Sequence, residues 1–94
     1  MAFFTTRIEL YSPLRKDLLA LYEALRDEGF SNIIRDESGG RFLLPPGEFN
    51  KEGDCSKEQV LDMAIRCASK TNREYSILVT ESNGRSWAKL PKVK

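Results

Sequence analysis

The chain has 94 residues, of which 40% are hydrophobic and 31% charged, with a net charge of +1. This balance is typical of one small globular domain over residues 1–94, and it excludes a disordered chain. No stretch is long and apolar enough to predict a membrane-spanning helix or a signal peptide, so we expect a cytoplasmic protein with no membrane partner. Histidine, the most common general base and zinc ligand, is absent. The sequence predicts no metal site and no cofactor.

Positive charge gathers at the C-terminus. The last ten residues contain Arg85, Lys89, Lys92 and Lys94 and no acidic residue. A basic tail of this kind can contact phosphate groups. The alternative is a frayed, solvated terminus.

The first predicted elements are a strand and a helix. Residues 3–11 alternate in polarity, as a half-buried strand does. Ser12 and Pro13 predict a helix start, because an N-cap hydroxyl followed by proline is a typical start signal. Leucines at spacings of three and four extend this helix to about residue 28, and Gly29 supplies a left-handed stop.

The middle of the chain predicts a strand, a turn and a return strand. Residues 30–35 form the strand, and residues 36–40 are rich in types that tolerate the backbone of a tight turn. The return strand can lie at residues 41–44 or at residues 48–50, on either side of a Pro-Pro-Gly interruption. The sequence leaves these two positions open.

The second half predicts a helix, a strand and a hairpin. A serine-led capping box and apolar residues at helical spacing predict a helix over residues 56–70. Residues 74–81 alternate as a strand. The Asn-Gly pair at 83–84 is a strong hairpin signal, so we expect residues 86–90 to return as a short edge strand.

The order of the predicted elements is β, α, β, β, α, β, with an optional extra C-terminal strand. Two amphipathic helices need a sheet face to bury against, and right-handed crossovers then give an α+β fold. We expect a ferredoxin-like βαββαβ sandwich, an antiparallel sheet with two helices on one face. The residues expected to meet in its core are Leu18, Leu21, Leu25, Val60, Ala64, Cys67, Ile8, Ile33 or Ile34, Ile77 and Val79.

The turn at residues 36–40 is a candidate site. Arg35 and Arg41 flank it, and the short connection should bring them together. Two guanidinium groups so placed can hold one phosphate, with Asp36 and Glu37 orienting them in the free protein. The alternative is a solvated, salt-bridged turn.

The run F-S-N-I-I-R-D-E-S-G at residues 30–39, following an amphipathic helix, resembles the matching stretch of the GhoS-type antitoxins of type V toxin–antitoxin systems. The similarity continues through Phe49 to the serine-led second helix. The resemblance implies a ferredoxin-like endoribonuclease that cuts a toxin message, and it lines up Phe49 with an aromatic residue tied to activity. Tyr22 stands where the family has a helix arginine, and Arg26 lies one turn later.

The preferred hypothesis is a GhoS-like small protein that binds single-stranded RNA, a toxin mRNA, with cleavage left open. Cleavage without histidine would use attack by the 2′-hydroxyl of the RNA, with arginines stabilising the developing charge and a carboxylate or tyrosine moving protons. The candidate catalytic residues are Arg35, Asp36 and Glu37. The candidate RNA-binding residues are Arg41, Phe49, Arg85, Lys89 and Lys92.

The alternative function is a non-enzymatic regulatory or inhibitory module. Such a module would bind a protein partner through the open sheet face or through an edge strand. A near-neutral isoelectric point of about 7.7 favours this alternative over a dedicated nucleic-acid binder. The chain is expected to be a monomer or a homodimer.

Overall fold

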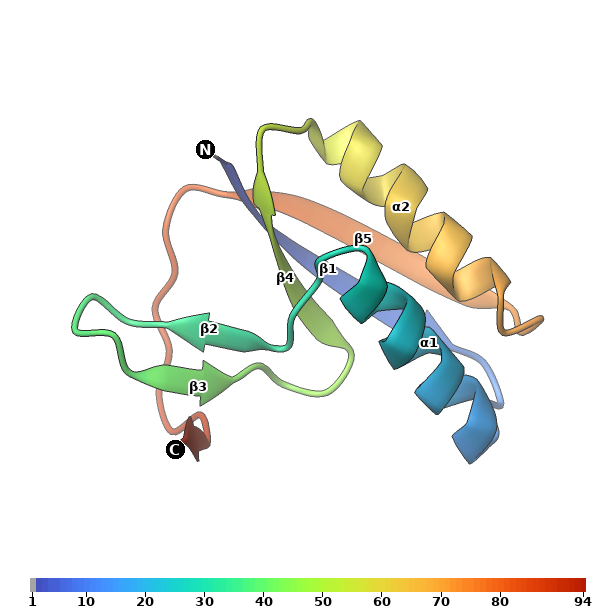
Figure 1. The fold of residues 1–94 in the computed structure, drawn as a ribbon, viewed down its shortest axis with the longest axis horizontal. Coiled ribbons are helices and arrows are strands. Elements are labelled where there is room, and N and C mark those ends of the chain that lie inside the picture. The colour runs from blue at the N-terminus through green and yellow to red at the C-terminus, as the bar shows by residue number, and fades with distance from the viewer. Residues whose placement is uncertain (1) are drawn as a thin grey trace.

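The computed structural model describes residues 2–94, which form two helices and six strands (Figure 1). In chain order these are β1 (Ala2–Leu10), α1 (Arg15–Asp27), β2 (Ile33–Arg35), β3 (Arg41–Leu43), β4 (Glu48–Gly53), α2 (Lys57–Ser69), β5 (Tyr75–Ser82) and β6 (Lys92–Val93). The strands make two antiparallel sheets, which confirms the α+β class. Neither of these helices is long and apolar enough to cross a membrane.

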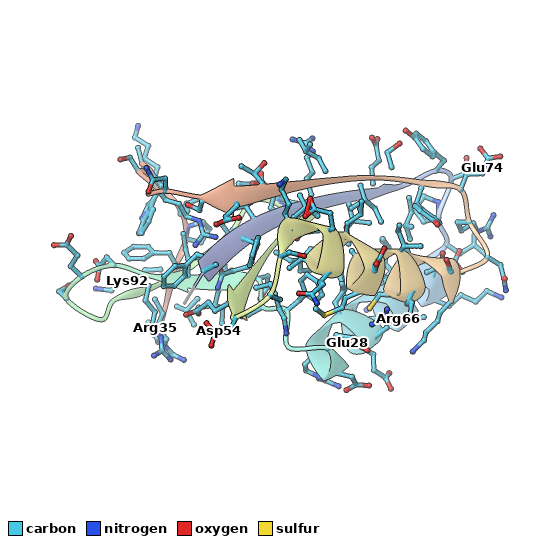
Figure 2. The ribbon with its side chains drawn as sticks, turned by 90° about the horizontal axis from the view of Figure 1, so that it is seen from above. Glu28, Arg35, Asp54, Arg66, Glu74 and Lys92 are labelled. Carbon is cyan, nitrogen blue, oxygen red and sulfur yellow. The ribbon has the colours of Figure 1, made fainter. Side chains whose placement is uncertain are left out.

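The larger sheet has the strand order β4–β1–β5. Both helices cover one of its faces, and the opposite face is open (Figure 2). Ser31, just before β2, exchanges two backbone hydrogen bonds of 2.9 Å and 2.6 Å with Asn50 of β4. This bridge sets the segment after α1 beside β4, as the ferredoxin-like order requires. The segment beside β4 forms this single bridge and not a full strand, because the chain then turns away into the smaller sheet.

The core lies between the larger sheet and the helices. Alternate residues of β1 are buried, because successive side chains of a strand point to opposite faces. The buried cluster consists of Phe4, Ile8, Leu10, Leu21, Ala24, Leu25, Phe30, Phe49, Val60, Ala64, Cys67 and Ala68. Leu18, Ile77 and Val79 pack against it, so most of the expected core is confirmed. One correction is needed: Ile34 is buried but lies outside this cluster, because β2 belongs to the smaller sheet.

The start of α1 differs from the sequence prediction, whereas its end does not. The helix begins at Arg15 rather than after the predicted Ser12 cap, because Ser12 turns the chain with a φ of 52°. The carboxylate of Asp17 instead accepts a hydrogen bond from the backbone N–H of Leu14 at 2.8 Å. Gly29 ends the helix with a φ of 88°, which confirms the predicted left-handed stop.

Both candidate positions for the return strand are strands. β3 pairs with β2 in a hairpin, and β4 pairs with β1 in the larger sheet. The Pro-Pro-Gly segment separates them, since proline cannot donate to a sheet ladder. Gly47 at its end has a φ of 84°, and its carbonyl accepts the N–H of Ile8 at 2.8 Å. The hairpin extends beyond the larger sheet, and β6 pairs with its outer strand, β3 (Figure 1).

The predicted hairpin at residues 83–84 is wrong. The chain does not return along β5, and residues 86–90 form no strand. Two side chains explain the path: Arg85 hydrogen-bonds to the larger sheet, and the Trp87 ring lies 5.5 Å from the Phe42 ring of the hairpin. The extra C-terminal strand is therefore β6, and Leu43 donates a backbone hydrogen bond to Pro91 at 2.9 Å. The tail is ordered against the hairpin, not frayed.

Candidate functional site

Three arginines gather around one cleft between the larger sheet and the hairpin. Arg35 and Arg41 are directly opposite each other in the β2–β3 ladder, so their side chains leave the same face of the hairpin. Arg85 reaches the cleft from the segment after β5. All three line a cavity of about 510 Å³, the arginine cleft. The structure thus unites three of the predicted site residues, two from the turn and one from the tail.

Hydrogen bonds to the open sheet face fix Arg85 in position. Its Nη2 donates to Asn50 Oδ1 at 2.6 Å and to Thr5 Oγ1 at 3.0 Å, and its Nε donates to Thr5 Oγ1 at 3.2 Å. Burial lowers the pKa of this guanidinium from its usual range, and the nearby Glu52 carboxylate opposes that effect. An arginine remains positively charged at neutral pH despite such a shift. Nη1 makes no hydrogen bond to residues 2–94, which leaves it available to a ligand.

Arg35 and Arg85 also line a second cavity, of about 610 Å³. Phe3 is shared by the two cavities, and Trp87 lines only the second. Phe3 is 44% exposed, on the open face of the larger sheet. The two cavities thus meet at a pair of arginines and an aromatic ring. Guanidinium groups bind phosphates, and aromatic rings stack on bases.

Sequence reasoning missed three residues of the arginine cleft. Glu52 and Asn50 extend from the open face of β4, and Phe3 lies opposite Glu52 on β1. The alternation of side chains between the two faces of β4 could have indicated them. The sequence, however, left two positions open for that strand. Glu52 brings a carboxylate to the cleft and accepts a hydrogen bond from Asn50 Nδ2 at 3.2 Å.

The two predicted acidic residues serve the turn. Asp36 Oδ1 accepts hydrogen bonds from Ser38 Oγ at 2.9 Å and from Gly40 N at 2.7 Å. Mainly for this reason its pKa lies below the usual value, and Lys92 adds a smaller effect in the same direction. Glu37 is exposed at the tip of the turn. Both acids line the second cavity, but Asp36 orients the turn backbone rather than the arginines.

Phe49 is not part of the arginine cleft. It is 6% exposed, and it faces the helices, with its ring 5.8 Å from the ring of Tyr22. Together with Arg26 these two rings line a separate groove of about 520 Å³ beside α1. Tyr22, Arg26 and Phe49, the positions that the family resemblance singles out, therefore line one groove. This groove is on the helix-covered side of the larger sheet, whereas Thr5 is on the open face.

The two predicted lysines of the tail lie outside the cleft. Lys92 is in β6, opposite Phe42, so its side chain leaves the hairpin on the face away from Arg41. Lys89 is exposed in the connecting segment. Figure 2 shows Lys92 and Arg35 at the hairpin end of the molecule, far from Glu74. The lysines can add positive potential there without lining either cavity.

The geometry of the arginine cleft suits an anionic ligand. Arg35 makes no hydrogen bond or ion pair with residues 2–94, and Arg41 donates to the backbone carbonyl of Lys94. Within the same part of the chain, no group of three or more potential metal ligands lies together. No protein-family model matches this chain, and no curated protein matches it significantly.

Proposed function

We propose that this protein binds single-stranded RNA at the arginine cleft, as a GhoS-like antitoxin acting on a toxin mRNA would. The observation that carries the proposal is the meeting of Arg35, Arg41 and Arg85 around one cavity. A solvated turn does not require three guanidinium groups at one cleft, so their position together favours binding of an anion. A cytoplasmic location is part of the proposal, because a messenger RNA is present there.

The path of the RNA follows from the two adjoining cavities. A phosphate held between Arg35 and Arg85 would have one neighbouring nucleotide in each cavity, since both residues line both. Phe3, which is exposed, and Trp87, which is half-buried beside Phe42, offer ring surfaces for stacking that do not depend on the base. Single-stranded RNA fits this arrangement better than a duplex, whose bases are not free to stack on side chains.

Cleavage forms the second part of the proposal. Arginines beside a phosphate stabilise the charge that develops when a 2′-hydroxyl gives up its proton and attacks the phosphorus, which forms a 2′,3′-cyclic phosphate as the P–O5′ bond breaks and the 5′-oxygen takes up a proton. Among the carboxylates, Glu52 is the better candidate to move a proton, because it lines the arginine cleft, whereas Asp36 is occupied by three donors of its own turn. Arg35 keeps its proposed catalytic role, and Glu52 replaces the acids of the turn.

A titration of labelled single-stranded RNA across several salt concentrations tests the binding. Three phosphate contacts predict a slope of log affinity against log salt of roughly −2. An absence of binding at low salt would contradict the proposal and favour the protein-partner alternative. Incubation of the same RNA with and without a chelator tests cleavage. Loss of cutting in Glu52→Gln with unchanged binding is the expected result, and full cutting by this variant would remove Glu52 from the reaction.

A further inference from the structure

Strand β5 lies at the end of the larger sheet with one edge unpaired. It spans Tyr75–Ser82, and it pairs only with β1 among the strands described in residues 2–94. The opposite end of the sheet is different, because Ser31 bridges β4 there before the chain enters the hairpin. An eight-residue edge of this kind offers a row of hydrogen-bonding groups to another strand.

The register shows which backbone groups face outward. The N–H of Tyr11 bonds to the carbonyl of Glu74, so these residues form a hydrogen-bonded pair of the β1–β5 ladder. Because such pairs alternate along an antiparallel ladder, the even-numbered residues of β5 bond to β1. The odd-numbered residues therefore direct their N–H and C=O groups to the free edge. They are Tyr75, Ile77, Val79 and Glu81.

This edge lacks the usual protection against pairing. Natural edge strands carry lysine, proline or a bulge, and β5 has no lysine or proline and keeps one continuous register with β1. Leu78 is 64% exposed at its centre, the most exposed of the large hydrophobic side chains described. Ile77 and Val79 are only half-buried although they face the helices. All three would be covered by a neighbouring strand.

We propose that β5 pairs antiparallel with β5 of a second copy of this chain, with Leu78 on the two-fold axis. In this register Ile77 faces the second copy's Val79 in a hydrogen-bonded pair. Leu78 faces the second copy's Leu78 in a non-hydrogen-bonded pair, the type in which opposed side chains are closest. Shifting the axis to Ile77 or Val79 would leave Leu78 opposite a serine or a threonine.

The polar residues agree with this register. Glu81 of one copy lies opposite Tyr75 of the other, so no like charges are directly opposed. Arg73 of the second copy is near the same end of its strand as Tyr75. Paired residues share a sheet face, so the two open faces continue as one surface. Both arginine clefts then lie on the same side of the dimer. The dimer itself does not depend on RNA binding.

Sedimentation equilibrium over a range of protein concentrations tests the dimer. The wild-type chain should dimerise, and Leu78→Glu should raise the dissociation constant by about 100-fold or more, because two carboxylates would meet on the axis. The monomer should stay folded, since Arg7 lies opposite position 78 on β1 and can pair with the new carboxylate. Leu19→Glu is the matched control, a 55% exposed leucine on α1. A monomeric wild type, or equal effects of the two variants, would overturn the proposal.

Single cysteines test the register. Under oxidation, Leu78→Cys should give a covalent dimer, because its two copies face each other at the axis. Thr80→Cys should not, since position 80 faces position 76 of the second copy. The wild-type chain controls for its own thiols, of which Cys67 is buried and Cys55 half-buried. Efficient crosslinking through Ile77→Cys or Val79→Cys in place of Leu78→Cys would overturn the assigned axis.

Discussion

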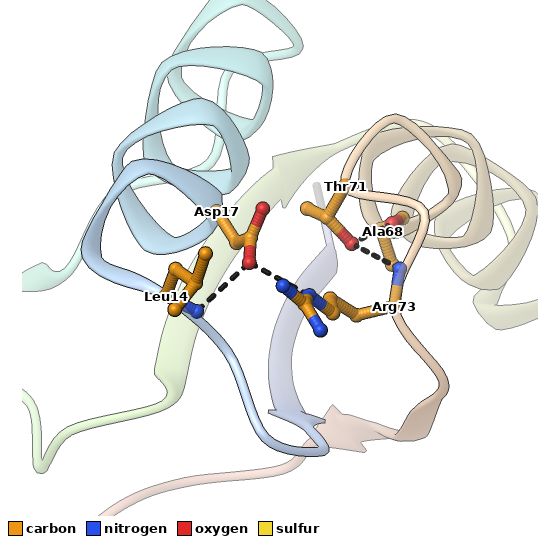
Figure 3. Close-up of polar contacts among 5 residues, drawn as sticks. All are labelled: Leu14, Asp17, Ala68, Thr71 and Arg73. Atoms are coloured by element: carbon orange, nitrogen blue, oxygen red, sulfur yellow. Dashed lines mark hydrogen bonds and ion pairs between the residues drawn. The ribbon is translucent and has the colours of Figure 1, made fainter.

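Asp17 and Arg73, 56 residues apart in the chain, form an ion pair in which Asp17 Oδ2 lies 2.8 Å from Arg73 Nε (Figure 3). The same carboxylate oxygen caps the start of α1 through the N–H of Leu14. Thr71, whose hydroxyl bonds to the carbonyl of Ala68, shapes the turn that presents Arg73. One buried carboxylate thus fixes the first helix to the connection between α2 and β5.

Replacing Asp17 by Asn should change how stability depends on pH. The hydrogen bond from Leu14, followed by the contact with Arg73, lowers the pKa of Asp17 from 3.8. Because the folded-state value is below the unfolded one, the ionised carboxylate stabilises the fold above about pH 3.8, and this contribution is lost as the pH falls further. Urea unfolding should show wild type more stable than Asp17→Asn at neutral pH, with the difference shrinking in acid. Asp62→Asn, at an exposed position of α2, should show no such change.

Leu21→Ala should destabilise the protein by about 2–5 kcal/mol, because Leu21 is 2% exposed and its removal leaves a cavity between α1 and the sheet. Leu19→Ala changes the same residue type on the same helix at an exposed position, and should stay within about 0.5 kcal/mol of wild type. Denaturant unfolding of the two variants measures both values. Equal losses would contradict the placement of the core.

The sequence predicts the main elements well because their signals are local. The alternation of β1 and β5, the capping box at Ser56 and the stop at Gly29 each depend on a few neighbouring residues. One error arose where a distant residue decides: the contacts of Arg85 with β1 and β4 prevent the hairpin that Asn83-Gly84 predicts. The other error is local, because Ser12 turns the chain and Asp17 caps the helix through the N–H of Leu14.

The part of the candidate site that depends on a local signal was predicted, and the part that depends on distant residues was not. The approach of Arg35 and Arg41 follows from a short turn, and the register confirms it. The entry of Arg85 and Glu52 into the same cleft could not be predicted, since it depends on where β4 lies and on the path after β5. The position of Phe49, buried against Tyr22, follows from the face that β4 presents to the helices.

Arg85→Met should cost about 1–3 kcal/mol of stability, because Asn50 and Thr5 lose a hydrogen-bond donor at a partly buried position. Arg35→Met removes the same charge from an exposed position without a bonding partner among residues 2–94, and should be nearly neutral. Thermal unfolding compares the two. Similar melting temperatures would show that Arg85 does not secure the segment after β5.

Lys89→Ala combined with Lys92→Ala should weaken RNA binding only slightly. Neither lysine lines the arginine cleft, and Lys92 projects from the other face of the hairpin. Their contribution is a general attraction for phosphate, which salt screens. A fluorescence titration at low and moderate salt should show the difference from wild type fading as salt rises. A large loss that persists at moderate salt would place the lysines in the binding site.

The arginine cleft itself is tested most directly by RNA affinity in Arg35→Ala combined with Arg41→Ala. Arg15→Ala combined with Arg66→Ala is the control, because it removes the same charge from exposed helix positions. Both double variants should melt close to wild type, since the altered side chains carry little stability. We predict that the first loses most of its affinity for single-stranded RNA and has a shallower salt slope, while the second keeps both. Equal affinities of the two folded variants would contradict the proposed site.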